Sequence, residues 1–415
     1  MATVEPDIHS IELTEDELWD EGPPHGVFKR MRAECPVHRT EHFFSDLPDE
    51  PGFWSVTTAE DIHAVSRDWQ TYSSEVGGIT AAEVLPAELS RAMFIGMDPP
   101  KHDRVKALFQ AGFTPKRIAA HEERIREIAK EVLDRLDGRE RCDLVTEVAQ
   151  PVVARVIGSF MGISEEEDAI WAELMNSMLG GGDEDLNPEG IDAIMGKLVP
   201  DLFARCGKLI AARREHPTDD LTSVLVHAEV DGEKLEEHEI VMGFFLLMAA
   251  GNDSTKATYC SGMRALMEDD EQRRLLIEDP ELVPDAVEES LRMFPAFAHF
   301  RRTTTRDVVL HGQEIKQGEK VVMWYVSSNR DETRYEDPDR FDLRRKAEHQ
   351  AFGAGGRHFC LGTALARLEL RILIEETLAR YPRIAIDGEP EFVRSAFINQ
   401  LKTLPVVLDG PSAAA

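Results

Sequence analysis

The sequence predicts a mainly α protein with a small β region, folded as a single large domain over residues 1–415. Three observations support this fold class. Helical periodicity dominates the middle of the chain, short strand signals lie toward its two ends, and no long Pro- or Ser-rich linker divides its 415 residues. Length alone would suggest about two to three domains, but the missing linker favours one.

The helices are predicted from apolar residues three or four positions apart among charges. In 121–136 (HEERIREIAKEVLDRL), Ile125, Ile128 and Val132 fall on one stripe, as in an amphipathic helix. Similar patterns predict helices over 147–161, 191–214 and 280–293. Strands are predicted at 52–56, 308–310, 321–326 and within 397–407. The glycine-rich acidic segment 180–190 is interpreted as a solvated connector, with a mobile lid as the alternative.

Charge and composition exclude several classes of partner. The 47 Lys and Arg residues against 78 Asp and Glu residues give a net charge of -31, which disfavours nucleic acid and anionic membrane surfaces. The acidic N-terminus does not resemble a signal peptide, and the apolar run 240–250 is shorter than the roughly 20 residues that a bilayer span needs. Five scattered cysteines indicate a reducing compartment. We therefore expect a cytoplasmic protein with neither nucleic-acid nor membrane partners.

Several short motifs do not amount to sites on sequence grounds. His238 begins a zinc-protease-like pattern, but Met242 stands where its second histidine would be. Cys35 and His38 have a metal-ligand spacing, yet no second pair follows at a zinc-finger distance. The glycines at 353–355 begin like a dinucleotide fingerprint but lack its third glycine.

Cys360 lies in a more informative setting, the segment 352–365 (FGAGGRHFCLGTAL). It follows a glycine-rich loop and precedes an apolar helix-forming run, so its sulfur is predicted near a helix N-terminus. Backbone N–H groups and the helix dipole favour a thiolate there. A thiolate in this position can ligate a metal axially, and the glycines allow a flat macrocycle to approach the backbone. A buried core cysteine is the commoner role of a lone cysteine, but the surrounding residues favour ligation.

The segment 352–362 resembles the cysteine loop of the cytochrome P450 superfamily of haem-thiolate monooxygenases. Four further elements match the family in order: 98–106 (DPPKHDRVK), 250–255 (AGNDST), 289–292 (ESLR) and 337–341 (DPDRF). The resemblance is to the soluble bacterial members. It implies the cytochrome P450 fold and haem b, with Cys360 as the iron ligand.

A structural clamp is predicted from Glu289, Arg292 and Arg340. Glu289 and Arg292 are three residues apart on one helical face, where a carboxylate and a guanidinium can pair. The resemblance adds Arg340 as a second guanidinium, which would satisfy a buried carboxylate from two sides. These residues are assigned to stability, with no part in the chemistry.

The catalytic residues are predicted at Asp253, Ser254 and Thr255. They follow Ala250 and Gly251 in a central helix, where a glycine and hydroxyl side chains weaken the helical hydrogen bonds and open a groove for dioxygen and water. The acid relays protons and a hydroxyl holds the oxygen by hydrogen bonds. The family pattern most often has Thr directly after the acid. This chain has Ser254 followed by Thr255, so both hydroxyls remain candidates.

The resemblance also implies the residues that hold the haem. The propionate contacts are His102, Lys106, Arg302 and His358, and the further cofactor-binding residues are Ala250, Gly251, Phe352, Cys360 and Gly362. Lys106 stands where the family more often has Arg. Phe352 precedes Cys360 by eight positions, where seven is commoner, so one residue is expected to bulge at Gly355–Gly356. The longer loop is similar to those of bacterial members that hydroxylate sterol side chains and branched lipids.

The substrate is predicted to be hydrophobic, because the segments that should line the pocket are apolar. The candidate pocket residues are Phe244, Leu247, Met248, Phe297, Phe397 and Ile398. The implied reaction inserts one atom of dioxygen into a C–H bond of a terpenoid, steroid or branched lipid.

Electrons are expected from a separate ferredoxin with its ferredoxin reductase, and the chain is expected to act as a monomer. The predicted docking site is a basic patch near Lys106, Arg344, Arg345 and Arg357. The alternatives are a peroxide-driven haem enzyme, a non-catalytic haem or lipophile-binding protein of the same fold, and a helical scaffold without haem. The acid and hydroxyl residues at 253–255 argue against the first two.

Overall fold

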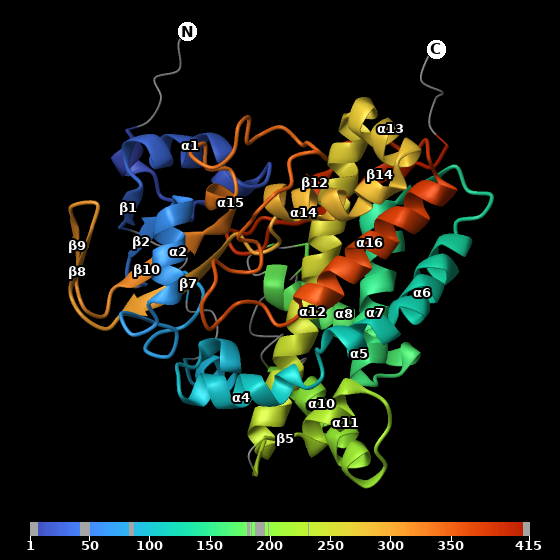
Figure 1. The fold of residues 1–415 in the computed structure, drawn as a ribbon, viewed down its shortest axis with the longest axis horizontal. Helices are drawn as coiled ribbons and strands as arrows, with labels where there is room; N and C mark the ends of the chain where they lie inside the picture. Colours follow the sequence, from blue (N-terminus) through green and yellow to red (C-terminus); the bar gives the residue numbers. More distant parts are fainter. Residues whose placement is uncertain are drawn as a thin grey trace.

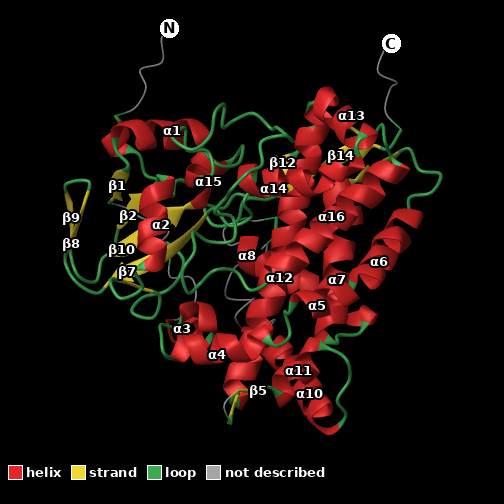
Figure 2. Ribbon diagram, in the orientation of Figure 1, coloured by secondary structure: helices red, strands yellow, loops and turns green. Residues whose placement is uncertain are grey.

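The protein consists of a helical body with a smaller sheet region beside it (Figures 1 and 2). The structure is a computed structural model. It describes residues 7–41, 50–82, 87–180, 183, 185–186, 196–197, 199–230 and 232–409. The mainly α fold class with small sheets is therefore confirmed.

The helices range from short connecting helices to long helices of the core. They are α1 (His25–Glu34), α2 (Ala59–Arg67), α3 (Ala87–Ala92), α4 (Lys101–Gln110), α5 (Pro115–Ala120), α6 (Glu122–Asp134), α7 (Gln150–Met161), α8 (Asp168–Gly180), α10 (Val199–Glu215), α11 (Leu221–His227), α12 (Glu237–Glu268), α13 (Asp270–Glu278), α14 (Val283–Met293), α15 (Tyr325–Ser328) and α16 (Thr363–Arg380). Short 3-10 or π turns precede several of them, including η1 (Ile8–Ser10).

The largest sheet has the order β1-β2-β10-β7-β3 and combines strands from both ends of the chain. Its strands are β1 (Val37–Thr40), β2 (Phe53–Val56), β3 (Tyr72–Ser73), β7 (His299–Thr304) and β10 (Lys320–Trp324). The smaller sheets are formed by β4 (Arg141–Asp143), β11 (Ala385–Ile386) and β14 (Pro405–Val407), by β5 (Glu229–Val230) and β6 (Glu233–Lys234), by β8 (Val308–Leu310) and β9 (Gln313–Ile315), and by β12 (Glu391–Phe392) and β13 (Leu401–Thr403).

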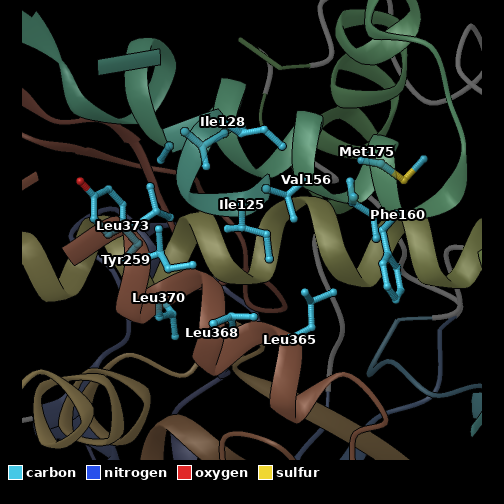
Figure 3. Close-up of a cluster of buried hydrophobic side chains, with 14 of the residues drawn as sticks. Ile125, Ile128, Val156, Phe160, Met175, Tyr259, Leu365, Leu368, Leu370 and Leu373 are labelled. Atoms are coloured by element: carbon cyan, nitrogen blue, oxygen red, sulfur yellow. The ribbon is translucent and has the colours of Figure 1, made fainter. Parts of the chain in front are cut away.

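Helix α12 runs through the middle of the helical body. A capping box between Glu236 and Glu239 starts it, and the long apolar run that follows is buried among α7, α8 and α16. Figure 3 shows side chains of the surrounding helices, including Ile125, Val156 and Leu370, gathered around α12. Burial of this apolar surface is the main stabilising contribution to the body.

The predicted helices and strands are largely present. Helix α6 lies within the predicted 121–136, and a π turn at Val145–Ala149 together with α7 covers the predicted 147–161. Strand β10 ends at Trp324, so the strand predicted over 321–326 is two residues too long. The N–H groups of Tyr325 and Val326 both donate to the carbonyl of Ala298, at 2.8 and 3.4 Å, and the chain turns into α15.

Other expectations concern the connector, the membrane and the cysteines. Most of the connector 180–190 lies outside the described residues. Over the described ranges, none of the helices is both long and apolar enough to cross a bilayer. All five cysteines are free thiols, and Cys360 differs from the other four because it is exposed.

The predicted clamp forms at the C-terminal end of α14. Arg292 makes a two-pronged ion pair with Glu289, with both N···O distances at 2.7 Å, and both side chains are almost fully buried. Arg292 also donates to the carbonyls of Asn329 and Pro338, at 2.9 and 2.8 Å. This pair therefore ties α14 to the loop that leads toward the cysteine segment.

The second guanidinium of the clamp belongs to Arg345, so the prediction of Arg340 was wrong. Arg345 Nε donates to Glu289 Oε1 at 3.1 Å. The side chain of Arg340 is exposed, and its carbonyl accepts hydrogen bonds from Arg292 and Arg345. The positive φ of Asp337 shows how sharply the loop turns, and this turn brings the more distant Arg345 back to the carboxylate.

We expect Arg345→Ala to lower the free energy of unfolding by about 2 kcal/mol, because a buried carboxylate loses a charged hydrogen-bond donor. Arg340→Ala is the matched control and should change it by less than about 0.5 kcal/mol, since the carbonyl of residue 340 remains. Urea unfolding of the two variants measures both values. Equal effects would show that Arg345 does not complete the clamp.

Candidate active site

A cavity of about 740 Å³ lies between the middle of α12 and the cysteine loop. Its walls come from α4, α12, β7, the start of α16 and the segment around 394–397. Cys360 lines it, together with the predicted cofactor-binding residues Ala250, Gly251, Phe352 and Gly362. The five residues, predicted from two separate motifs, thus meet at one internal space.

The cysteine loop is held in a tight, glycine-dependent conformation. The N–H of Cys360 donates to the carbonyl of Phe352 at 3.0 Å and closes the loop. Gly355 and Gly356 have φ values of +86° and +83°, a left-handed conformation that favours glycine. A Cβ atom on Gly356 would also lie 2.7 Å from the carbonyl oxygen of Ser66. The irregular backbone falls where the extra residue was expected to bulge.

The Cys360 sulfur faces the cavity, which accounts for its exposure despite the protein around it. Desolvation raises the pKa of its thiol, while the Gly362 N–H, which hydrogen-bonds to the sulfur, and the charges of Lys106 and Arg367 oppose that rise. The hydrogen bond expected near the helix start is therefore present. Without a bound cation, however, burial raises the pKa of the thiol more than this hydrogen bond lowers it. A positively charged ligand at the sulfur would favour the thiolate.

Glu288 braces the cysteine loop from behind. Its carboxylate accepts hydrogen bonds from Arg367 of α16, at 2.6 and 2.9 Å, and contacts His349 at 3.1 Å. Arg367 in turn lies 4.8 Å from the ring centre of Phe352. These partners lower the pKa of Glu288 to about 2 against the opposing effect of burial, which is the largest single influence. The loop is thus fixed between α14 and α16.

Four polar side chains gather at another wall of the cavity. His102, Lys106, Arg302 and His358 all line it, as predicted for the propionate contacts. The rings of His102 and His358 lie 4.3 Å apart. Burial lowers the pKa values of both histidines and of Arg302, because each is removed from water. Lys106 donates to the carbonyls of Arg357 and Phe359, so its ammonium also ties the cysteine loop to α4.

The polar atoms that line the cavity fit a haem group. His102 Nε2 and His358 Nδ1 are buried with no hydrogen-bond partner in the described structure. Unpaired polar atoms and the buried Arg302 guanidinium are costly unless a polar or anionic group meets them. Haem propionates would supply such groups, and Cys360 would ligate the iron. The donor set, the apolar walls and the glycines of the loop therefore fit haem.

The three predicted catalytic residues lie in different environments. Ser254 and Thr255 line the cavity. The Ser254 hydroxyl donates to the carbonyl of Ala250 at 2.6 Å, and this leaves its oxygen free to accept a hydrogen bond. Asp253 is fully buried and is not among the lining residues, because its carboxylate forms an ion pair with Lys256. Lys256 also donates to Gln150 and Asn176, at 2.8 and 2.6 Å.

Glu369 is a site residue that the sequence analysis missed. It lies on α16, lines the cavity and hydrogen-bonds with the Thr255 side chain. Burial raises the pKa of its carboxyl to about 8, and the Thr255 hydrogen bond opposes this only in part. The signal in the sequence is an acidic residue between Leu368 and Leu370, within the apolar run after Cys360.

The predicted substrate residues divide into two groups. Leu247, Phe297 and Phe397 line the cavity. Phe244, Met248 and Ile398 are buried elsewhere in the core and are not lining residues, so those three predictions were wrong. Phe244 packs against Trp171 of α8, with ring centres 5.4 Å apart, because this face of α12 is turned away from the cavity. Phe245 and Leu246 line it instead.

Comparisons with known proteins agree with this geometry. The family model "Cytochrome P450" matches residues 197–392. A methyl-branched lipid omega-hydroxylase of Mycobacterium tuberculosis is 36% identical over 414 residues, covering 96% of this chain and 95% of that protein. The chain belongs to the cytochrome P450 family. A steroid C26-monooxygenase of Mycolicibacterium smegmatis is 33% identical over 410 residues, covering 97% of each chain.

The fold of this cytochrome P450 matches solved structures over nearly its whole length. A Mycobacterium marinum cytochrome P450 in complex with pseudoionone has a TM-score of 0.89 and 36% identity, and the match covers 98% of this chain and 100% of that one. This chain is a haem-dependent monooxygenase whose cofactor is haem b. The expected recognition, enzyme class and cofactor are confirmed.

We expect Glu369→Gln to alter the pH dependence of stability. Folded Glu369 keeps its proton up to a pKa of about 8, whereas the unfolded chain releases it near about pH 4.3. The free energy of unfolding therefore falls as pH rises through this window, by up to about 1.4 kcal/mol per pH unit. Between about pH 6 and about pH 8, the wild type should lose about 2 kcal/mol relative to the variant in urea unfolding. Parallel pH profiles would contradict a protonated Glu369.

Proposed function

We propose that this cytochrome P450 hydroxylates a C–H bond of a hydrophobic molecule with a branched alkyl chain: a methyl-branched lipid, a steroid or a terpenoid. The observation that carries the proposal is the apolar cavity that opens directly onto Cys360. Phe297, Phe300 and Phe397 form one wall, with ring centres 5.2 to 5.7 Å apart. Such a wall binds aliphatic surface through burial and offers little to a polar substrate.

Two further observations support a branched substrate. The relatives named above carry names that refer to a methyl-branched lipid and to a steroid. The cysteine loop is also one residue longer than the commoner family spacing and is bent at Gly355–Gly356. This longer loop resembles those of members that hydroxylate branched lipids and sterol side chains.

Bound haem supplies the activation of dioxygen, and the chain's own residues position the reactants and the protons. In this proposal Ser254 is the hydroxyl that gates proton delivery, because its donated hydrogen bond to Ala250 leaves its oxygen facing the cavity. Thr255 instead serves to hold Glu369. Asp253 delivers protons only after its carboxylate leaves Lys256, so the ion pair controls the relay.

Electrons are proposed to come from a ferredoxin that docks over the cysteine loop. Arg344 and Arg357 are exposed, and Phe359 of the cysteine loop is 43% exposed. Three residues of the predicted docking patch have other partners. Arg345 belongs to the clamp, Lys106 binds loop carbonyls, and Arg357 pairs with Asp103 at 2.6 Å. Arg67 adds a cation, because its Nη1 atom lies 3.7 Å from the position of a Cβ on Gly355. An acidic ferredoxin surface suits this patch.

The proposal is tested with the purified protein and panels of methyl-branched fatty acids, steroids and terpenes. We expect the carbon monoxide difference spectrum of a haem-thiolate protein, its loss in Cys360→Ala, and a spin-state shift with at least one branched compound. With ferredoxin, reductase and ¹⁸O-labelled dioxygen, the product should contain one labelled oxygen atom.

The other readings give different results in the same assay. Turnover with hydrogen peroxide but not with ferredoxin would indicate a peroxide-driven enzyme. A spectral shift without turnover from either source would indicate a binding protein.

We expect Ser254→Ala to uncouple the reaction. Without this hydroxyl, proton delivery is misdirected, so dioxygen takes up two electrons and two protons and leaves as hydrogen peroxide. Product per electron pair should fall at least about 10-fold, with a matching rise in peroxide, when the best ligand of the panel is used. Thr255→Ala is the matched control and should stay mostly coupled. The reverse order would assign the gate to Thr255.

A further inference from the structure

A second cluster of metal-ligating side chains lies at the edge of the large sheet, outside the cavity. It consists of His9 on η1, Cys35 at the end of α1 and His38 on β1. One ligand atom from each residue lies within 4.8 Å of the others. The cysteine and histidine that the sequence placed at a metal-ligand spacing thus acquire a third partner, 26 residues upstream of Cys35.

The separation of Cys35 and His9 suits a tetrahedral ion. Cys35 Sγ lies 3.8 Å from His9 Nδ1. With a Zn–S bond of about 2.3 Å and a Zn–N bond of about 2.0 to 2.1 Å, tetrahedral angles place sulfur and nitrogen about 3.6 Å apart. Cys35 and His9 are therefore close to the required spacing, and His38, whose ligand atom lies within 4.8 Å of both, needs a side-chain adjustment to close around one ion.

The tautomer of His38 is also that of a metal ligand. Its Nε2 atom lies 2.8 Å from the carbonyl oxygen of Ile11. Because a carbonyl only accepts hydrogen bonds, Nε2 carries the proton and Nδ1 keeps a free lone pair. Metal-bound histidines commonly have such a backbone acceptor on their other nitrogen, which fixes the tautomer and the ring orientation.

The backbone around the cluster is well anchored. The N–H of Cys35 donates to the carbonyl of Met31 at 2.8 Å and ends α1. His38 lies in β1, paired with Ser55 of β2. Both side chains are buried, whereas His9 is exposed on η1. Two ligands are thus held rigidly, and the third approaches from the solvent side, which leaves room for water as a fourth ligand.

From this geometry we propose that Cys35 Sγ, His9 Nδ1 and His38 Nδ1 bind one Zn²⁺ ion, with a water molecule in the fourth position. On binding, a Zn–S bond forms, and the Cys35 thiol releases its proton to solvent. The ion joins η1 to the α1–β1 corner and so fastens the N-terminal segment to the sheet. The thiolate and two imidazoles favour zinc over the hard cations Mg²⁺ and Ca²⁺.

The test uses the untagged, haem-loaded full chain, because a histidine tag would itself bind zinc. The protein is treated with a chelator, given equimolar ZnCl₂ and desalted, and zinc is then measured against haem iron. We expect about one zinc per chain in the wild type. The variants His9→Ala and Cys35→Ser should lose it, while the matched controls His216→Ala, an exposed histidine elsewhere, and Cys142→Ser, a buried cysteine elsewhere, should keep it.

Zinc-edge X-ray absorption identifies the ligands without interference from the haem iron. We expect one sulfur at about 2.3 Å and nitrogen or oxygen neighbours at about 2.0 to 2.1 Å, with the sulfur absent in Cys35→Ser. Zinc should raise the thermal unfolding midpoint of the wild type but not that of His9→Ala.

Chelator competition should show that His9→Ala weakens zinc binding at least about 100-fold. Since His9 is exposed, this variant should fold normally, as its unchanged haem spectrum would show. Zinc retention by His9→Ala equal to the wild type, or a zinc shell without sulfur, would overturn the proposal.

Discussion

The buried carboxylate of Glu289 is the constraint on which the rest of the haem side depends. An isolated charge in the core is costly, so Glu289 must be met by donors, and Arg292 and Arg345 provide them from two sides. The donors on these two guanidiniums that do not face Glu289 bind carbonyls of the loop spanning 329–340. Satisfying one charge thereby fixes the path of the chain that leads to Cys360.

Glu288, the residue before Glu289, forms a similar set of charged hydrogen bonds with the segments around the cysteine loop. Glu288 points to Arg367 and His349, and Arg367 stacks near Phe352. Consecutive acidic residues on α14 thus hold two different segments, one on each side of the helix end. Apart from Lys106, the charged groups that position the loop do not line the cavity, whose inner surface carries Cys360, the apolar walls and the unpaired nitrogens of His102 and His358.

Many of the predicted residues that line the cavity are related to one another by local spacing. Cys360, Phe352 and Gly362 lie in one short loop, and the residues at 250–255 lie on one helix, so their positions relative to one another follow from the local backbone. The clamp shows where prediction from local spacing fails. Glu289 and Arg292 share one helical face, but the choice between Arg340 and Arg345 depends on how an irregular loop folds back. In the same way, the rotation of α12 about its axis determines that Phe245 lines the cavity and that Phe244 is buried in the core.

By itself the sequence determined the fold class and the central helix with its hydroxyls, because these depend on periodicity and on residues a few positions apart, and its resemblance to a known family pointed to the cysteine that lines the cavity. Only the tertiary structure showed that Glu369 meets Thr255, that Asp253 is held by Lys256, and that His9 joins Cys35 and His38. Except for the ion pair along α12, these contacts join segments far apart in the chain. Even in that pair, burial of α12 decides that Lys256 turns inward. Such contacts are determined by tertiary packing, so they cannot be predicted from sequence periodicity.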